Sequence, residues 1–239
     1  MMKSFDQLNV KVFADGADLD GMIAMAREPH IKGFTTNPTL MNKAGIKDYA
    51  EFARAALKAI PDRPISFEVF SDEFDEMERQ AREIASWGSN VYVKIPVTNT
   101  RGEFAGPLVA RLTTAGVKVN VTALMTASQV HDVSRNLTPG VPSCVSVFAG
   151  RIADTGRDPL PIMVDALTML APIAGAELIW ASPREFLNVF QADQIGCHII
   201  TVTNDLLKKI PLLGKDLDLF SLETVEMFRR DAVSAGFSL

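Results

Sequence analysis

Residues 91–98 read Val-Tyr-Val-Lys-Ile-Pro-Val-Thr, a run of β-forming residues with a single lysine, Lys94, near its middle. Side chains alternate between the two faces of a strand, which puts Lys94 on the same face as Tyr92 and Pro96 and opposite Val93 and Ile95. Charged side chains are seldom fully buried. Two interpretations are open at this point: Lys94 reaches solvent from an edge strand, or it is held inside a site that uses its amine.

Segments of this kind recur along the chain and alternate with helical patterns. The predicted strands are residues 11–14, 33–36, 65–70, 91–98, 117–122, 143–148, 177–181 and 198–202. The predicted helices are residues 18–28, 47–59, 72–87, 103–115, 126–135, 160–170, a segment that opens at Pro183, residues 203–209 and residues 221–235. Pro183 suits the first turn of a helix, whereas Pro38 is expected to end the strand before it. The segment after residue 148, rich in Gly, Arg and Asp, is predicted to be a loop.

The number and order of these elements indicate the fold class. Eight strands alternating with helices over 239 residues favour an α/β protein with one (β/α)₈ TIM barrel domain spanning residues 1–239. A doubly wound open sheet is the alternative, but no Gly-x-Gly-x-x-Gly turn follows any predicted strand. The last helix, residues 221–235, is not needed to close a barrel. We expect it to cap a barrel face or to pack on a neighbouring subunit.

The composition excludes several classes of function. The net charge is −5 and the predicted isoelectric point is about 5.3, which does not suit a nucleic-acid-binding surface. No apolar run approaches the length of a membrane span, and the first residues lack the apolar core of a signal peptide. Cys144 and Cys197 fall inside predicted strands, as expected for buried, reduced thiols of a cytoplasmic protein.

Polar side chains cluster where the predicted strands end, which is where barrels of this type hold their active sites. The candidates are Asp15, Thr36, Asn37, Glu68, Lys94, Asn120, Thr122, Ser146, Phe148, Arg151, Ser182 and Arg184. Several have a local explanation when taken singly: Asp15 as a turn cap, Asn37 as an Asx-turn before proline, and Arg151 with Asp154 as an exposed ion pair. The coincidence of so many at one rim favours a site.

This set suits Schiff-base chemistry. The neutral amine of Lys94 would attack a ketone and lose water to leave an iminium, which accepts electrons when a neighbouring carbon–carbon bond breaks. A carboxylate, Glu68 or Asp15, with the hydroxyl of Thr122, would position a water for the proton transfers. Arg151 and Arg184, with Ser182 at the predicted helix N-terminus, suit a phosphate. No cluster has metal-ligand spacing, so we expect no metal and no dissociable cofactor.

Several motifs, in their order along the chain, resemble those of the transaldolase family. They are Thr35-Thr-Asn-Pro-Thr39, Val93-Lys-Ile-Pro-Val-Thr98, Asn120-Val-Thr122, Ser146-Val-Phe-Ala-Gly-Arg-Ile152 and Ala181-Ser-Pro-Arg184. The resemblance runs from about residue 10 to beyond residue 230. It implies a class I aldol mechanism on a (β/α)₈ barrel, with sugar phosphates as substrates.

The resemblance also implies a role for each candidate residue. Lys94 would form the Schiff base, and Asp15 and Glu68 would move protons through a water held by Thr122. The remaining candidates would bind substrate. Asn37 and Asn120 would contact the sugar, Ser146 a sugar hydroxyl, and Arg151, Ser182 and Arg184 the phosphate, while Thr36 and Phe148 complete the substrate-binding set. Pro183 departs from the family pattern, which has a phenylalanine between the serine and the arginine.

Two positions separate transaldolases from the fructose-6-phosphate aldolases that resemble this chain closely. The aldolases carry a tyrosine where Phe148 stands and a glutamine where Glu68 stands, so this chain matches the transaldolases at both. The alternatives that remain are an aldolase of the fructose-6-phosphate type, or a related class I aldol enzyme, and a sugar-phosphate-binding barrel without catalysis. By resemblance, helix 221–235 would pack on a neighbour in a homo-oligomer, a pentamer or a decamer.

Overall fold

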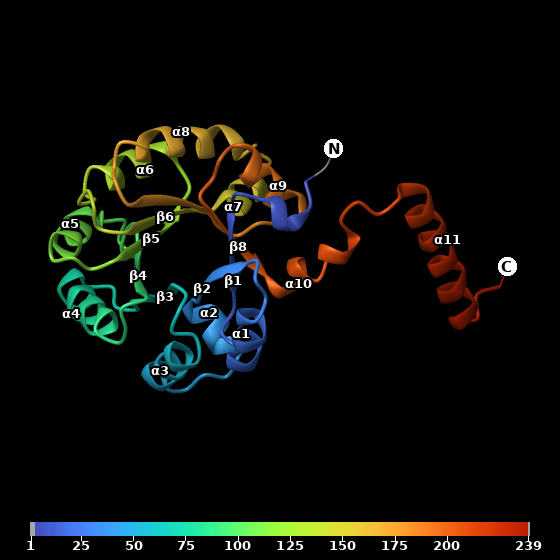
Figure 1. Cartoon of the computed structure of the whole chain (residues 1–239), viewed down its shortest axis with the longest axis horizontal. Helices are drawn as coiled ribbons and strands as arrows, with labels where there is room; N and C mark the ends of the chain where they lie inside the picture. Colours follow the sequence, from blue (N-terminus) through green and yellow to red (C-terminus); the bar gives the residue numbers. More distant parts are fainter. Residues whose placement is uncertain (1–2, 239) are drawn as a thin grey trace.

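A closed barrel of eight parallel strands forms the body of the molecule, with helices around it (Figure 1). The computed structural model describes residues 3–238. Its strands are β1 (Lys11–Asp15), β2 (Ile31–Thr35), β3 (Ile65–Glu68), β4 (Val91–Pro96), β5 (Val119–Leu124), β6 (Ser143–Val147), β7 (Ala176–Trp180) and β8 (Ile199–Thr203). Each strand pairs with the next along the chain, and β8 pairs with β1, which confirms the predicted (β/α)₈ barrel.

The helices alternate with these strands. They are η1 (Phe5–Gln7), α1 (Leu19–Ala26), α2 (Pro38–Lys43), α3 (Tyr49–Ala59), α4 (Phe74–Ala85), α5 (Gly106–Thr114), α6 (Ala127–Ser134), α7 (Ala149–Asp154), α8 (Leu160–Leu170), α9 (Leu187–Gln194), α10 (Asn204–Leu207), η2 (Ile210–Leu212) and α11 (Leu217–Ser234).

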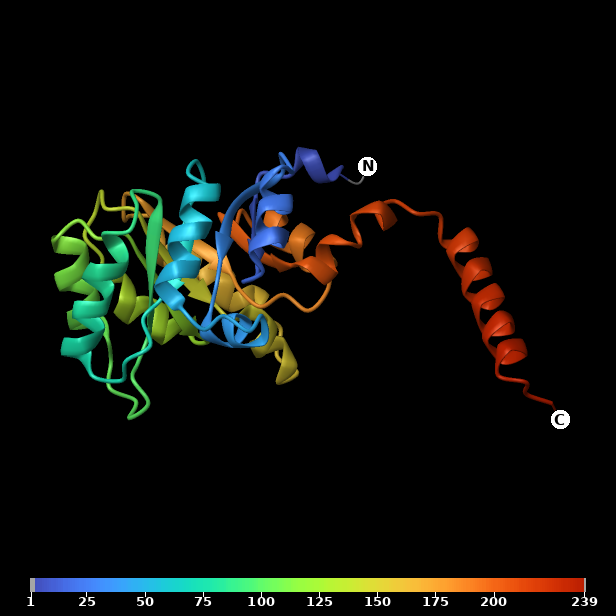
Figure 2. The same ribbon diagram turned by 90° about the horizontal axis from the view of Figure 1, so that it is seen from below.

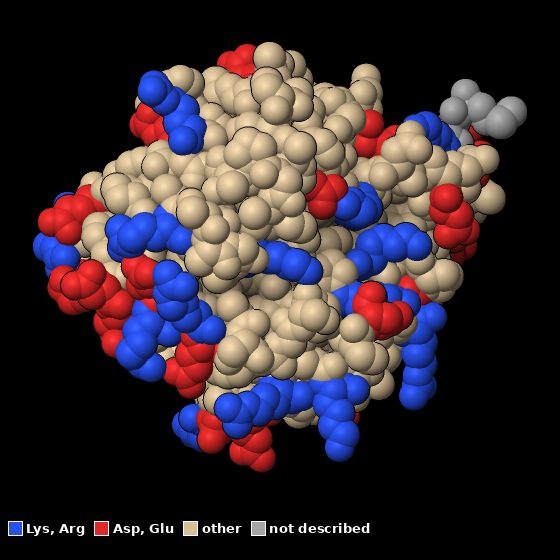
Figure 3. All heavy atoms as spheres, turned by 60° about the vertical axis from the view of Figure 1, so that its left-hand side comes forward, with Lys and Arg blue, Asp and Glu red and all other residues tan. Residues whose placement is uncertain are grey.

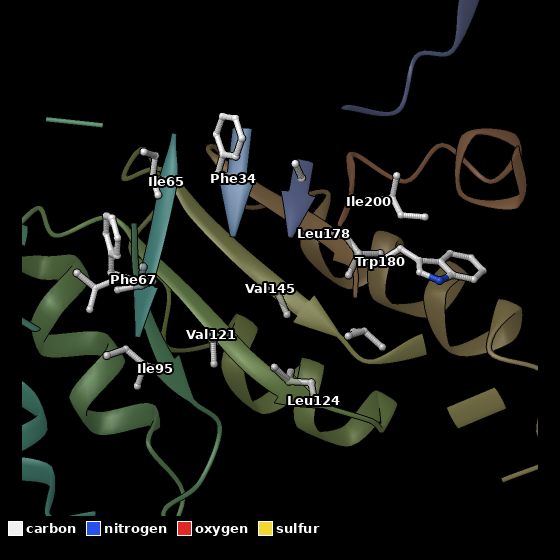
Figure 4. Close-up of a cluster of buried hydrophobic side chains, with 14 of the residues drawn as sticks. Phe34, Ile65, Phe67, Ile95, Val121, Leu124, Val145, Leu178, Trp180 and Ile200 are labelled. Atoms are coloured by element: carbon white, nitrogen blue, oxygen red, sulfur yellow. The ribbon is translucent and has the colours of Figure 1, made fainter. Parts of the chain in front are cut away.

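Alternation along the strands divides the core into two clusters. The larger lies between strands and helices, and it includes the fully buried side chains labelled in Figure 4, such as Phe67 on β3 and Val121 on β5. The smaller contains Phe13 on β1 and Ile179 on β7, with the half-buried Tyr92 of β4 packed against it. Tyr92 shares its strand face with Lys94, so the smaller cluster fills the barrel interior and the lysine points into the barrel.

Three segments differ from the sequence prediction. Pro38 follows the end of a strand, as predicted, but it is also the first residue of the short helix α2. The side chain of Asn37 caps this helix by accepting the Leu40 N–H at 2.9 Å. Residues 149–154, predicted as loop, form the helix α7. The helix predicted to open at Pro183 begins only at Leu187, so Ser182 and Arg184 lie in the turn after β7 and not at a helix N-terminus.

The C-terminal helix stands away from the barrel. Figures 1 and 2 show α11 separated from the barrel by an extended connection in both views. It begins at Leu217, four residues before the predicted start, with the Asp216 side chain as its N-cap. None of its side chains is buried, and Leu222, Val225 and Phe228 are 55%, 59% and 63% exposed. The helix therefore does not cap a face of its own barrel.

The surface carries charges of both signs. On the face drawn in Figure 3, lysines and arginines are interspersed with aspartates and glutamates, and no large area of one sign is visible. Ion pairs account for part of this pattern; Arg79, for example, contacts both Glu76 and Glu83 along α4. Among the helices of residues 3–238, none has the length and apolar character to cross a membrane.

Candidate active site

Lys94 lies inside the barrel beside a carboxylate. It is 7% exposed, and its Nζ lies 3.2 Å from Glu68 Oε2 and donates to the carbonyl of Thr36 at 3.2 Å. The register of the parallel strands β3 and β4 sets Glu68 directly opposite Lys94. The lysine is therefore not the solvent-exposed residue of an edge strand. An amine in this position can attack a carbonyl carbon and exchange protons with the neighbouring carboxylate.

Asp15 supplies a second carboxylate at the same end of the barrel. The hydroxyl of Thr35 donates to Asp15 Oδ1 at 2.8 Å, and the two residues are paired in the register of β1 and β2. Burial raises the pKa of Asp15 above its ordinary value, and the nearby Lys94 and the Thr35 hydrogen bond oppose part of that rise. A carboxyl group whose pKa is raised takes up a proton more readily than an ordinary aspartate, which suits a group that exchanges protons with a substrate.

A chain of buried hydrogen bonds in the barrel interior links side chains of β3, β5 and β6. Ser146 Oγ donates to Asn120 Oδ1 at 2.7 Å, and Asn120 Nδ2 donates to Ser66 Oγ at 3.1 Å. All three residues are at most 3% exposed. The two serines hold the Asn120 amide from both sides, with its oxygen toward Ser146 and its nitrogen toward Ser66. Lys94 lies opposite Asn120 in the register of β4 and β5.

Thr122 lies one step further along β5, opposite Pro96. It is 2% exposed, and its hydroxyl has no protein hydrogen-bond partner. Buried hydroxyls usually have one, so this oxygen is free to hold a water or a substrate group. The next residue, Ala123, has a φ of +66°, and the register with β6 is interrupted there. Such strained backbone is concentrated at functional sites.

The three predicted phosphate ligands lie together at the rim, where α7 meets the turn after β7. A Cβ built on Gly150 would lie 1.5 Å from the carbonyl oxygen of Ser182, so only glycine allows these two segments to approach so closely. Ser182 itself has a φ of +60°. Arg151 follows Gly150, and its guanidinium carbon is 5.6 Å from the ring centre of Phe148.

Asp154 pairs with Arg184 and not with Arg151, the pairing considered from the sequence. Arg184 Nε donates to Asp154 Oδ1 at 2.9 Å, and a second nitrogen of the same guanidinium contacts the other carboxylate oxygen. The Asn188 side chain accepts the main-chain N–H groups of Arg184 and Glu185 at 2.8 and 2.9 Å. The turn after β7 is thus held by Asp154 through a side chain and by Asn188 through the main chain.

The structure brings most of the predicted site residues to one end of the barrel, with two adjustments. The hydroxyl of Thr36 donates to the carbonyl of Ser66, and it is the preceding Thr35 that contacts Asp15. The side-chain oxygen of Asn37 accepts a hydrogen bond as the N-cap of α2. Ser66 was not anticipated, although it precedes Glu68 by two residues on β3, a spacing that puts both on one strand face. Within residues 3–238, no three His, Cys, Asp or Glu side chains are grouped as metal ligands would be.

Comparison of the sequence with protein families finds one matching model. The description of that family is "Transaldolase/Fructose-6-phosphate aldolase", and the match covers residues 12–238. A protein named "Probable transaldolase" from Thermoanaerobacter sp. (strain X514) is 36% identical over 234 residues, which are 96% of this chain and 100% of the relative. Another of the same name, from Dehalococcoides mccartyi, is 32% identical over 84% of this chain and 90% of the relative.

Solved structures support the fold alone. A structure described as a putative phosphonomutase from Burkholderia cenocepacia J2315 superimposes with a TM-score of 0.58 at 11% identity, covering 95% of this chain and 96% of that chain. KGPDC from Streptococcus mutans superimposes with a TM-score of 0.57, also at 11% identity, covering 83% of this chain and 89% of that chain. At this level of identity the likeness concerns the barrel and not its chemistry.

Proposed function

We propose that this chain, which belongs to the transaldolase/fructose-6-phosphate aldolase family, is a transaldolase that acts through a Schiff base on Lys94. It would transfer a dihydroxyacetone unit from a ketose phosphate, such as fructose 6-phosphate or sedoheptulose 7-phosphate, to an aldose phosphate. One observation carries the proposal: the amine of Lys94 is buried in the barrel, 3.2 Å from the carboxylate of Glu68. The names of the relatives, each a probable transaldolase, support the same reading.

The reaction begins with attack of the Lys94 amine on the ketone carbon of the donor. The carbinolamine loses water to give an iminium, and Glu68 supplies and removes protons through a water that Thr122 holds with its free hydroxyl. Asp15 takes the proton of the hydroxyl next to the bond that breaks. The electron pair of that bond moves to the iminium, an aldose leaves, and a three-carbon enamine remains on Lys94.

The enamine then attacks the carbonyl carbon of the acceptor aldose, and the steps run in reverse to release the new ketose. Asn37 and Asn120 would contact the sugar, with Thr36 beside them, and Ser146 would contact a sugar hydroxyl. The Ser66–Asn120–Ser146 chain supports this assignment, because it presents fixed donors and acceptors to the ligand and needs no reorganisation on binding.

The phosphate is assigned to Arg151, Ser182 and Arg184 at the rim. Two guanidinium groups on neighbouring segments provide the charge and the paired donors that phosphate oxygens accept. Asp154 holds Arg184 in the free protein and offsets one of the two positive charges. Ser182 does not lie at a helix N-terminus, since α9 begins at Leu187, so the two guanidinium groups carry the assignment.

An aldolase of the fructose-6-phosphate type, or a related class I aldol enzyme, is the second candidate, and Phe148 argues against it. A phenol at this position could donate a proton to the enamine and help release free dihydroxyacetone. The phenylalanine ring cannot, and Arg151 covers it. The enamine would then persist until an acceptor aldose arrives. A sugar-phosphate-binding barrel without catalysis would have no use for Asp15, Glu68, Lys94 and Thr122 together.

The experiment that tests this function measures transfer and release separately. Wild-type protein is given fructose 6-phosphate with and without an aldose phosphate acceptor, and both the new ketose and free dihydroxyacetone are quantified. We expect transfer to exceed release by far, and Lys94→Met to abolish both. Release at a rate comparable to transfer would favour the aldolase, and full transfer activity in Lys94→Met would refute the mechanism.

The exposed face of α11 suggests how the protein assembles. Leu222, Val225 and Phe228 recur at intervals of three residues on one side of the helix, and each is more than half exposed. A row of large apolar side chains of this kind is rarely left in contact with water. The helix projects beyond the barrel (Figure 2), so a second copy of this chain can receive it. We assign this role to α11 in a homo-oligomer, a pentamer or a decamer.

A further inference from the structure

Tyr49, the first residue of α3, contacts the main chain of Glu68 with its hydroxyl. The hydroxyl oxygen accepts the Glu68 N–H at 2.8 Å and donates its own hydrogen to the Glu68 carbonyl at 2.7 Å. One side-chain atom thus satisfies both main-chain groups of the residue that faces Lys94. No sequence motif of the chain indicates this contact, which joins residues 19 positions apart.

The contact between Tyr49 and Glu68 occurs at the end of β3, where the neighbouring strand β2 no longer pairs with it. Strand β2 pairs with β3 only through Phe34–Ile65 and Thr35–Ser66, and the Thr36 N–H makes the last bond, to the Ser66 carbonyl at 3.2 Å. In a parallel sheet the N–H and carbonyl of one residue point to the same neighbouring strand. Those of Glu68 point toward β2 after β2 has ended. The Tyr49 hydroxyl takes the place of the missing strand.

The surroundings of Tyr49 keep this hydroxyl fixed and protonated. Its ring makes edge contacts with Phe67 at 6.5 Å and Phe70 at 5.5 Å, and a tilted contact with Trp87 at 6.1 Å. Burial raises the pKa of Tyr49 above its ordinary value, so the phenol keeps the hydrogen that it donates. Because the ring has its own contacts, a phenylalanine can occupy the same position without the hydroxyl.

We propose that Tyr49 is a positioning residue for catalysis, which fixes the end of β3 so that the Glu68 carboxylate stays beside the Lys94 amine. This inference rests on the proposed function, because it assumes that Glu68 moves protons for a Schiff base on Lys94. The alternative is a structural role in which the hydroxyl only stabilises the fold. The two differ in whether the effect of Tyr49 depends on the Glu68 carboxylate.

The test compares Tyr49→Phe with Tyr92→Phe, which removes the hydroxyl of the other tyrosine in the chain. Tyr92 lies on the face of β4 that carries Lys94, two residues before it, and packs against the interior cluster. We expect Tyr49→Phe to lower kcat for transfer by about tenfold, because both hydrogen bonds to the Glu68 main chain are lost and the carboxylate is held less firmly beside Lys94. KM should change less than about twofold. Tyr92→Phe should leave kcat within about twofold of wild type. An unchanged kcat in Tyr49→Phe would overturn the proposal.

A double-mutant cycle decides between positioning and structure. If Tyr49 acts through the Glu68 carboxylate, Tyr49→Phe should change kcat less than about twofold when Glu68→Gln is already present. The same tenfold loss of kcat in both backgrounds would overturn the proposal. Circular dichroism measures the unfolding temperature of the variant, and a loss of kcat confined to temperatures at which it unfolds would also overturn the proposal.

Failure of the proposed function would be recognised separately, because wild-type protein would then show no transfer at all. Borohydride trapping of dihydroxyacetone on Lys94 still tests Tyr49 in that case. Slower trapping in Tyr49→Phe than in Tyr92→Phe would support positioning, and equal rates would overturn it.

Discussion

Gly150→Ala should displace the phosphate-binding rim while leaving the Schiff-base lysine in place. The added Cβ would lie 1.5 Å from the carbonyl oxygen of Ser182, whereas ordinary contacts begin at 3.4 Å. The two segments must therefore separate by about 2 Å. The obstacle is main chain and cannot rotate away, and Ser182 is already at a φ of +60°. Overpacking of this kind costs about 3 kcal/mol of folding stability.

The kinetic consequence follows from where the movement occurs. Gly150 precedes Arg151, and Ser182 lies two residues before Arg184, so the groups assigned to phosphate move apart. A misplacement of about 1 Å can lower activity by about 10²-fold. We expect the loss mainly as a higher KM for fructose 6-phosphate, with a much smaller effect on trapping of unphosphorylated dihydroxyacetone by Lys94.

The assay measures transfer kinetics, borohydride trapping and chemical unfolding for wild type, Gly150→Ala and a control, Gly16→Ala. A Cβ on Gly16 meets no atom within 4 Å, and Gly16 lacks the positive φ of many other glycines in the chain. Its unfolding free energy should stay within about 0.5 kcal/mol of wild type. A Gly150→Ala protein with unchanged stability and unchanged KM for fructose 6-phosphate would show that the contact between Gly150 and Ser182 does not position the phosphate ligands.

Three further predictions concern the interior and the C-terminal helix. Asp15→Asn should lower transfer about 10²-fold or more, yet raise the free energy of unfolding at pH 7. Because burial raises the pKa of Asp15, ionisation of its carboxyl destabilises the folded protein as the pH rises above 3.8. The gain in stability should therefore vanish below about pH 4, and a variant less stable than wild type at pH 7 would contradict this. Asn120→Leu should cost about 2 kcal/mol in chemical unfolding, because the hydroxyls of Ser66 and Ser146 lose their partner; a change below about 0.5 kcal/mol would show that the buried chain is unimportant. Phe228→Asp should reduce the mass measured by light scattering to that of a single chain, whereas a wild-type protein that is already monomeric would contradict the assembly.

The barrel could be predicted because each strand carries its own pattern. Short runs of β-branched, aromatic and other apolar residues located all eight strands to within a few positions. The apolar periodicity of helices such as Leu160–Leu170 located those helices equally well. The six-residue helices α2 and α7 were missed because so few residues cannot show a helical period. At α7 the Gly-Arg-Asp composition is typical of a loop, and the close approach of Gly150 to the turn after β7 appears only in the folded protein.

The candidate site was predictable only as far as strand alternation extends. The rule that barrel sites lie where the strands end selected Glu68, Lys94 and Asn120, and alternation along the strands indicated which face each side chain shares. The partners that orient them come from other elements: Thr35 for Asp15, and Tyr49 for Glu68. Nothing in the local sequence identifies these pairs, since each forms only when the barrel closes.

The position of the helix after β7 illustrates the same limit. A proline suits the first turn of a helix, so Pro183 favoured an early start. In the structure, Pro183 is buried and the Asn188 side chain accepts the N–H groups of two residues of the turn, which delays the helix to Leu187. The Asn188 side chain lies five residues beyond the proline, and its hydrogen bonds to the turn could not be predicted without the fold.

Borohydride reduction in the presence of fructose 6-phosphate, followed by mass analysis of the peptides, tests whether Lys94 forms the Schiff base. We expect a three-carbon adduct on Lys94 and on no other lysine, because this amine alone is proposed to attack the ketone. Lys94 left unmodified, in folded protein shown to bind the sugar phosphate, would contradict the mechanism and favour a binding protein.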